Sequence, residues 1–350
     1  MTLPVDIPKA LERPILYVGM TGFSPQQRAD LTAIVARPNG GWPIWRVGPF
    51  WEADAWWING SRISLLPNGD LRILAGQPTE QALNLKLEEV NRPVAFSTPL
   101  AVPDFEPACT FDPSSESSMH KVLQRFDVWL QPLLFRSALG ALIIEGGTAL
   151  RGSIYHVLSK STLLAVLDFR HGKAAVLPTA LPGDLKDAHW DKRPNGAHDL
   201  PESFSPCTPA QLVWIHARHT GHDLLPARYR TEVLYYRHAP RVPMGWLRDS
   251  MLRVLSALAV EPGTFQALRE RTGIADALLA SDLACLYYAG AVTTTAFKAA
   301  GSTLLRPERP SSHSRIEDLA ALDGGSTLPP MDSEQTAPAM LYQRPSRSAE

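Results

Sequence analysis

Three histidines, His216, His219 and His222, follow one another at intervals of three residues, and Asp223 comes directly after the last. On a helix, His216 and His219 would share a face, and two imidazoles on one face can coordinate one metal ion. His222 lies beyond a glycine, however, and the glutamate of a His-Glu-x-x-His protease motif is missing. Histidines in the last turn of a helix are also favoured by its dipole. We therefore predict no metal site and keep the three histidines as weak candidates.

The stretch from Ile215 to Arg253 is rich in arginine and aromatic residues. It holds seven arginines against three acidic residues, a formal surplus of four positive charges. Arginine, tyrosine and tryptophan are typical anchors of protein interfaces, and they also bind phosphates and stack on bases. We predict a protein partner here and keep nucleic acid as an alternative that we do not favour. The predicted partner or phosphate contacts are Arg218, Arg228, Tyr229, Arg230, Tyr235, Tyr236, Arg237, Arg241 and Trp246.

Recognisable catalytic motifs are missing from the sequence. It contains no Gly-x-Ser-x-Gly elbow, no phosphate-binding Gly-Lys-Ser/Thr and no Gly-x-Gly-x-x-Gly. The cysteines Cys109, Cys207 and Cys285 are far apart and fit neither a disulfide framework nor a zinc knuckle. We name no catalytic residue and no cofactor. Because active sites are often assembled from distant residues, an enzyme with a pocket in the first two domains remains an alternative.

Composition indicates a soluble globular chain of several domains. The 350 residues are 45% hydrophobic and 20% charged, with a formal net charge of -1, so any electrostatic partner must be met by a local patch. Asp6 and Glu12 stand where an export signal needs basic and then apolar residues. The apolar stretch 130–144 is interrupted by Gln131 and Arg136. We therefore expect a cytoplasmic protein without membrane insertion.

The first 105 residues are predicted to form an α/β domain. Its elements are a strand at 14–18, a helix at 26–35 begun by Ser24-Pro25, a hairpin around Asn68-Gly69, a helix at 79–90 and a strand at 94–96. This order is at best that of a degenerate receiver-like domain. A receiver needs acidic residues after its first strand, where this chain has Gly19-Met20-Thr21-Gly22.

The remainder is predicted as an α+β domain at 110–181, a linker at 182–207, a helix with an Arg/Tyr-rich connector at 208–246, a further module at 247–298 and a disordered tail at 299–350. A helix opened by Asp112-Pro113 and strands at 154–158, 162–169 and 174–177 build the α+β domain. The fold class is therefore α/β and α+β, with several domains.

Residues 247–297 show a distinct order of elements. A helix at 247–259 would turn Met251, Leu252, Leu255 and Leu258 inward. Thr264 caps a second helix, Gly273 turns the chain into a third at 275–289, and a strand follows at 291–295. Through TFQALRERTGI and LASDLACLYYAGAV, this segment resembles the winged helix-turn-helix superfamily.

The resemblance implies DNA binding, with the third helix in the major groove. That helix carries Asp276 and Asp282 but no basic residue, a charge that disfavours phosphate. We therefore expect a non-enzymatic regulatory or adaptor protein that acts in signalling through protein contacts. The alternative is a DNA-binding transcriptional regulator with N-terminal sensory domains.

Overall fold

The computed structural model describes residues 11–37, 42–78, 80–103, 105–194 and 199–300. They form two compact units: an N-terminal unit of residues 13–133, and a C-terminal unit of residues 134–300 together with residues 11 and 12. The mixed α/β class predicted from the sequence is confirmed, with one parallel sheet and several other sheets. The predicted domain boundary near residues 105–110 lies inside the N-terminal unit. Most of the predicted tail, from residue 301, lies outside the described residues.

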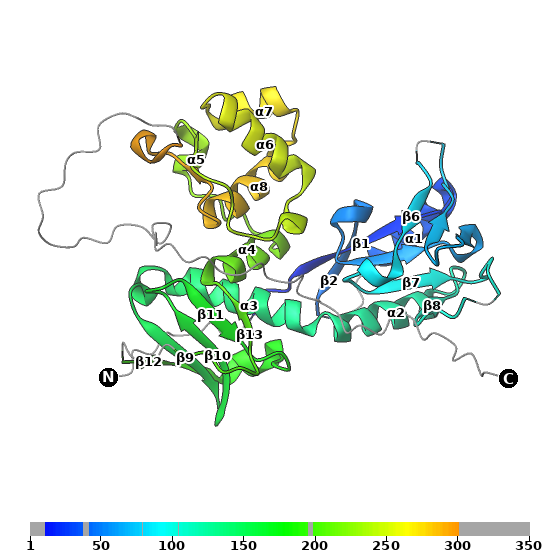
Figure 1. Ribbon diagram of the computed structural model, residues 1–350, viewed down its shortest axis with the longest axis horizontal. Coiled ribbons are helices and arrows are strands. Elements are labelled where there is room, and N and C mark those ends of the chain that lie inside the picture. The colour runs from blue at the N-terminus through cyan, green and yellow to red at the C-terminus, as the bar shows by residue number, and fades with distance from the viewer. Residues whose placement is uncertain (1–10, 38–41, 79, 104, 195–198, 301–350) are drawn as a thin grey trace, which may run out of the picture. The chain divides into compact units, whose positions relative to one another are not determined.

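The N-terminal unit is built on a parallel sheet with the strand order β2-β1-β3-β7-β8 (Figure 1). Helix α1 (Pro25–Val35) follows the first strand, and its predicted start is confirmed by a capping box between Ser24 and Gln27. Helix α2 (Glu116–Trp129) follows the last strand. The strands are β1 (Ile15–Thr21), β2 (Ile44–Gly48), β3 (Ala55–Ile58), β7 (Val94–Ser97) and β8 (Thr110–Phe111).

One face of this sheet is covered by a small antiparallel sheet of β4 (Ile63–Leu65), β5 (Leu71–Ile73) and β6 (Leu83–Leu85). The predicted hairpin at Asn68-Gly69 is confirmed, and Gly69 has the positive φ of 86° that its turn requires. The predicted helix at 79–90 is wrong. The alternating leucines of β6 pair with β5 and pack in the same core, so tertiary pairing overrides the helical propensity of this segment.

The other face of the parallel sheet packs against α2. The Trp45 and Phe126 rings lie 6.1 Å apart, and the Trp45 indole nitrogen donates a 2.7 Å hydrogen bond to Asp127. Trp57, on the same face, lies 4.9 Å from Phe111. Trp56, the residue before Trp57, packs on the opposite face with the small antiparallel sheet, so the two adjacent tryptophans of β3 fill the cores on both faces.

A single glycine allows the chain to pass over the central strand. Between β2 and β3 the chain forms a short 3-10 turn, Phe50–Glu52, that lies on β1. An added Cβ at Gly19 would stand 2.7 Å from the Cα of Phe50. Because that approach is closer than atoms tolerate, only glycine at position 19 permits the crossing.

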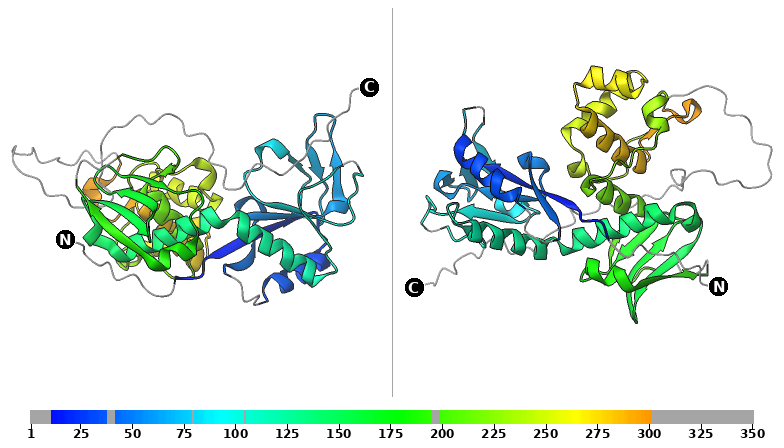
Figure 2. Two further views of the ribbon diagram at one scale, coloured as in Figure 1. Left: turned by 90° about the horizontal axis from the view of Figure 1, so that it is seen from below. Right: turned by 180° about the vertical axis from the view of Figure 1, so that it is seen from behind.

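The C-terminal unit contains helix α3 (Gln131–Gly146), except for its first three residues, and an antiparallel sheet with the order β12-β9-β10-β11-β13. Helix α3 lies along one face of this sheet (Figures 1 and 2). The predicted linker at 182–207 is wrong, because it contains both edge strands of the sheet. The strands are β9 (Ile154–Ser159), β10 (Thr162–Asp168), β11 (Lys173–Val176), β12 (Ala188–Arg193) and β13 (Ser205–Cys207).

Residues 131–150, which include α3, are long and apolar enough to cross a membrane by length and composition alone. Within this stretch, 56% of the most apolar window is buried inside the structure. Core helices show the same combination of apolar composition and burial. The stretch is therefore weak evidence for a membrane span.

A helical layer completes the C-terminal unit, and its small sheet pairs β14 with β15. The helices predicted around 211–220 and within 247–289 are present. Leu252 is 41% exposed, so its predicted inward position is wrong, whereas Val254 is fully buried. The elements are α4 (Pro209–His219), α5 (Arg228–Thr231), β14 (Tyr235–Tyr236), α6 (Asp249–Val260), α7 (Phe265–Thr272), α8 (Asp276–Tyr288) and β15 (Val292–Thr293).

Candidate functional site

The predicted contact residues lie from the end of α4, through α5 and β14, to the turn before α6. They do not form one exposed surface. Arg228, Arg230 and Arg241 are exposed, and Tyr229 is buried. The half-buried members are Arg218, Tyr235, Tyr236, Arg237 and Trp246.

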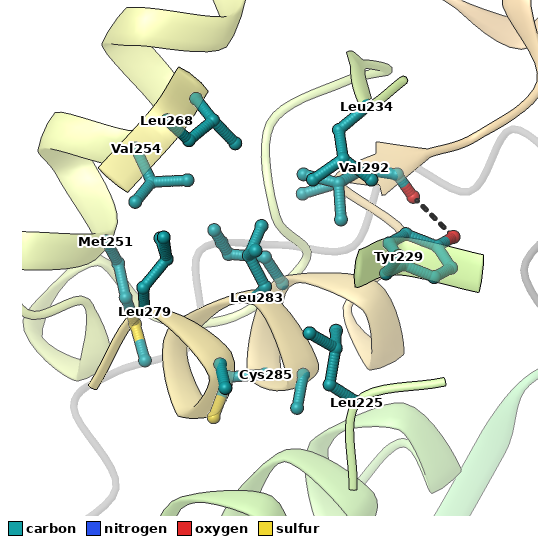
Figure 3. Close-up of a cluster of buried hydrophobic side chains, with 14 of the residues drawn as sticks. Leu225, Tyr229, Leu234, Met251, Val254, Leu268, Leu279, Leu283, Cys285 and Val292 are labelled. Carbon is teal, nitrogen blue, oxygen red and sulfur yellow. Dashed lines mark hydrogen bonds between the residues drawn. The ribbon is translucent and has the colours of Figure 1, made fainter. Parts of the chain in front are cut away.

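Tyr229 belongs to the core beneath α8, so its predicted contact role is wrong. Figure 3 shows its ring turned inward, toward the side chains that pack between the helices. Its hydroxyl donates a 3.4 Å hydrogen bond to the carbonyl oxygen of Val292. Burial raises the pKa of this tyrosine to about 12. A tyrosine placed between two arginines in the sequence therefore supports the fold from inside.

The arginines of this stretch have partners within the C-terminal unit. Arg230 forms an ion pair with Asp223, and its guanidinium lies 5.0 Å from the centre of the Phe265 ring. Arg228 lies 5.5 Å from the centre of its neighbouring tyrosine ring. Arg218 donates to the carbonyl oxygen of Trp246. These contacts hold the connector against the helices. Its arginine side chains therefore contribute in part to the stability of the fold.

Helices α6, α7 and α8 share one apolar core, and local signals set their ends. The Thr264 side chain caps α7 at its start, and Gly273 ends it with a φ of 66°. The isolated pairing of Leu234 with Gly263 fixes the segment before β14 beside the turn between α6 and α7. The Arg/Tyr-rich connector is therefore built into the same module as the three helices.

Four arginines lie within residues 247–297, and all four are bound within the chain. Arg248 pairs with Asp282 at 3.3 Å, and Arg269 pairs with Asp276 at 3.1 Å. Arg253 donates to a carbonyl oxygen at the end of α7, and Arg271 to two carbonyl oxygens near the end of α6. Arginines near the final carbonyls of helices stabilise those ends.

The two acidic residues of α8 differ in their surroundings. Asp276 lies at the start of the helix, with 61% of its side chain exposed. Asp282 is fully buried and faces Arg248, whose side chain is only 10% exposed. The expectation that both aspartates charge the surface of this helix is therefore wrong for Asp282. Sequence reasoning missed the pair because its partners lie 34 residues apart.

The exposed part of α8 is short and mainly apolar. Ala275, Ala277 and Leu278 lie at its start, and Leu278 is 39% exposed. The only charge on this stretch, Asp276, is paired with Arg269 of α7. This surface, which we call the α8 face, offers small apolar side chains beside one neutralised ion pair. Such a composition suits a protein surface better than a phosphate backbone.

The N-terminal unit has a second place where a ligand could be expected. In open parallel sheets, ligands bind beyond the carboxyl ends of the strands where the strand order reverses, here between β1 and β3. Asn59 occupies this edge and donates a 2.9 Å hydrogen bond to the carbonyl oxygen of Gly22. It also accepts hydrogen bonds from Ser61 and Ser97. The edge is thus occupied by side chains bonded to one another, a cluster that sequence reasoning missed because it joins three separate segments.

The three histidines do not gather around one point. His216 and His219 are buried on α4, and the Nδ1 atom of His219 lies 2.7 Å from the carbonyl oxygen of Ile215. His222 is exposed beyond the helix and faces Glu12. Burial lowers the pKa of His216 to about 4. Among the described residues, no group of three or more histidine, cysteine or acidic side chains could hold a metal ion.

No protein-family model matches the chain, and neither does any curated protein or solved structure that was compared with it.

Proposed function

We propose that the protein is a cytoplasmic regulatory or adaptor protein that acts through protein–protein contacts. In this proposal, residues 247–298 are a winged-helix unit whose third helix, α8, contacts a protein partner instead of a DNA groove. The α8 face would form the contact surface, and the exposed arginines of α5, which packs on α7, would be further contacts.

The observation that carries the proposal is that the arginines of this module bind groups within the module. Each of its four arginines is bound to a carboxylate or to a helix-end carbonyl. Nucleic-acid affinity depends on basic side chains that neutralise phosphates. A third helix that presents Ala277 and Leu278 lacks such side chains, whereas apolar patches ringed by polar residues are typical of protein contacts.

The experiment is affinity capture of the full chain from its native cell, with and without nuclease, using two matched variants. Leu278→Glu places a charge on the α8 face, and Val260→Glu places the same charge at an 84% exposed position at the end of α6. We expect a protein partner that survives nuclease treatment and is lost only with Leu278→Glu. Loss of all bound protein after nuclease treatment, or equal retention by both variants, would contradict the proposal.

The second candidate is DNA binding through the connector. It is favoured by the exposure of Arg228, Arg230 and Arg241. Each phosphate contact that an Arg228→Ser or Arg230→Ser variant removes should lower the slope of log affinity against log salt by about 0.9. Electrophoretic shifts over a salt series measure that slope. The absence of any shift at low salt would exclude this function.

A further inference from the structure

A glutamate from the start of the chain binds the end of α4. The Glu12 Oε1 atom accepts a 2.6 Å hydrogen bond from the hydroxyl of Thr220 and a 3.0 Å hydrogen bond from the amide of Gly221. The Nε2 atom of His222 lies 3.7 Å from the same oxygen, and the Nε2 atom of His216 lies 3.7 Å from Oε2. The Glu12 carboxylate therefore accepts one hydrogen bond from a hydroxyl and one from a backbone amide, and it lies near two imidazoles.

This contact lies at a chain connection between the two units. Within the described residues, the chain passes from one unit to the other after Glu12 and again after Leu133. Glu12 is the last residue of its segment that belongs to the C-terminal unit. The contacts that hold Glu12 therefore fix the start of one of the two connections at the end of α4.

The end of α4 and two imidazoles lie beside the Glu12 carboxylate. A carboxylate beside the carboxyl end of a helix meets the negative end of the helix dipole, so nearby positive charge is needed to favour it. Histidine is the side chain that gains positive charge between about pH 8 and pH 5. The two neighbouring imidazoles differ in exposure, since 75% of the His222 side chain is exposed but only 9% of the His216 side chain.

His222 is the exposed imidazole of the two, and its Nε2 atom lies 3.7 Å from the Glu12 carboxylate. Burial lowers the pKa of His216 to about 4, so His216 stays neutral well below neutrality. The charged or titratable groups that act on His216 are Glu12, His219 and His222. The helix packed over it, α3, contributes the uncharged Gly140 at that point. The nearby Asp223 is already paired with an arginine of α5.

We propose that Glu12 and His222 form a pH-sensitive clasp, which holds residue 12 against the end of α4 and tightens when His222 is protonated. Protonated His222 attracts the ionised Glu12, whereas neutral His222 leaves only the two hydrogen bonds to the carboxylate. The clasp thereby makes the attachment of residue 12 to the end of α4 depend on pH.

Hydrogen exchange of the full chain tests this clasp. The protection factors of the Gly221 amide and of the amides of residues 11–13 are measured at about pH 6 and about pH 8 and corrected for intrinsic rates. We expect about two- to fivefold greater protection at the lower pH, the range for an exposed ion pair. His222→Gln should abolish this difference, and His189→Gln, at an exposed histidine of β12, should leave it unchanged.

A second variant separates charge from hydrogen bonding. Glu12→Gln keeps an oxygen that can accept from Thr220 and Gly221 but removes the negative charge, so protection at the higher pH should persist while its pH dependence disappears. Equal wild-type protection at both pH values would overturn the proposal. So would a pH dependence that survives in His222→Gln.

Discussion

The buried pair of Arg248 and Asp282 gives the sharpest test of how the C-terminal helices are built. Replacing Asp282 by asparagine leaves a guanidinium that is almost fully buried without the carboxylate now 3.3 Å away. Breaking a buried pair in this way costs about 3–5 kcal/mol. Asp276, on the same helix, also pairs with an arginine but has 61% of its side chain exposed. Asp276→Asn should therefore cost less than about 1 kcal/mol.

The assay must report on this module alone, because the chain has two units that need not unfold together. Hydrogen exchange by mass spectrometry, on peptides from α6 and α8 over a urea series, gives a local free energy of opening. A double variant, Arg248→Met with Asp282→Leu, should recover most of the loss, because apolar replacement of a whole buried pair is often neutral or stabilising. Equal small effects of Asp282→Asn and Asp276→Asn would refute the assignment of Asp282 to the interior.

Three further changes test other parts of the structure. Gly140→Ala would place a Cβ 2.2 Å from the carbonyl oxygen of Leu212, so denaturation should show a loss of about 1–3 kcal/mol or more. Burial raises the pKa of Asp127 to about 6. The folded unit therefore loses stability as pH rises from about 4 to about 6. Asp127→Asn should remove that dependence of stability on pH in urea titrations, and it should be the more stable form at neutral pH. Tyr229→Phe should leave capture of the proposed partner unchanged and cost about 0.5–1.5 kcal/mol, measured by urea denaturation.

Local signals in the sequence located most elements correctly. Ser24, Thr208 and Thr264 are capping residues whose side chains accept hydrogen bonds from the first turn of their helices. The hairpin at Asn68-Gly69 is likewise set by four adjacent residues. In each of these cases, the residues that decide the structure lie within one turn of one another, so the sequence alone contains the necessary information.

Features that depend on distant residues could not be predicted in this way. Leu83 and Leu85 alternate as strand residues do, but their pairing with β5 decides against a helix. The sequence alone suggests that Asp282 is a surface charge, whereas in the structure it is buried beside Arg248. In the sequence, Gly19 resembles any other strand residue, whereas in the structure the turn at Phe50 packs directly on it. Burial and pairing are properties of the folded chain, and no local pattern shows whether a residue is buried or which residue it pairs with.

Helix α4 connects these observations within the C-terminal unit. Leu212 and Val213 pack in the core under the antiparallel sheet, whereas Trp214 and Ala217 pack in the core of α6, α7 and α8. Its last turn carries the histidine that faces Glu12. Because interiors are closely packed, a shift of α4 must disturb both cores at once. Helix α8 packs on α4. A partner that binds the α8 face would therefore reach both cores through α4, which is the physical basis on which a contact surface in this module could influence the rest of the unit.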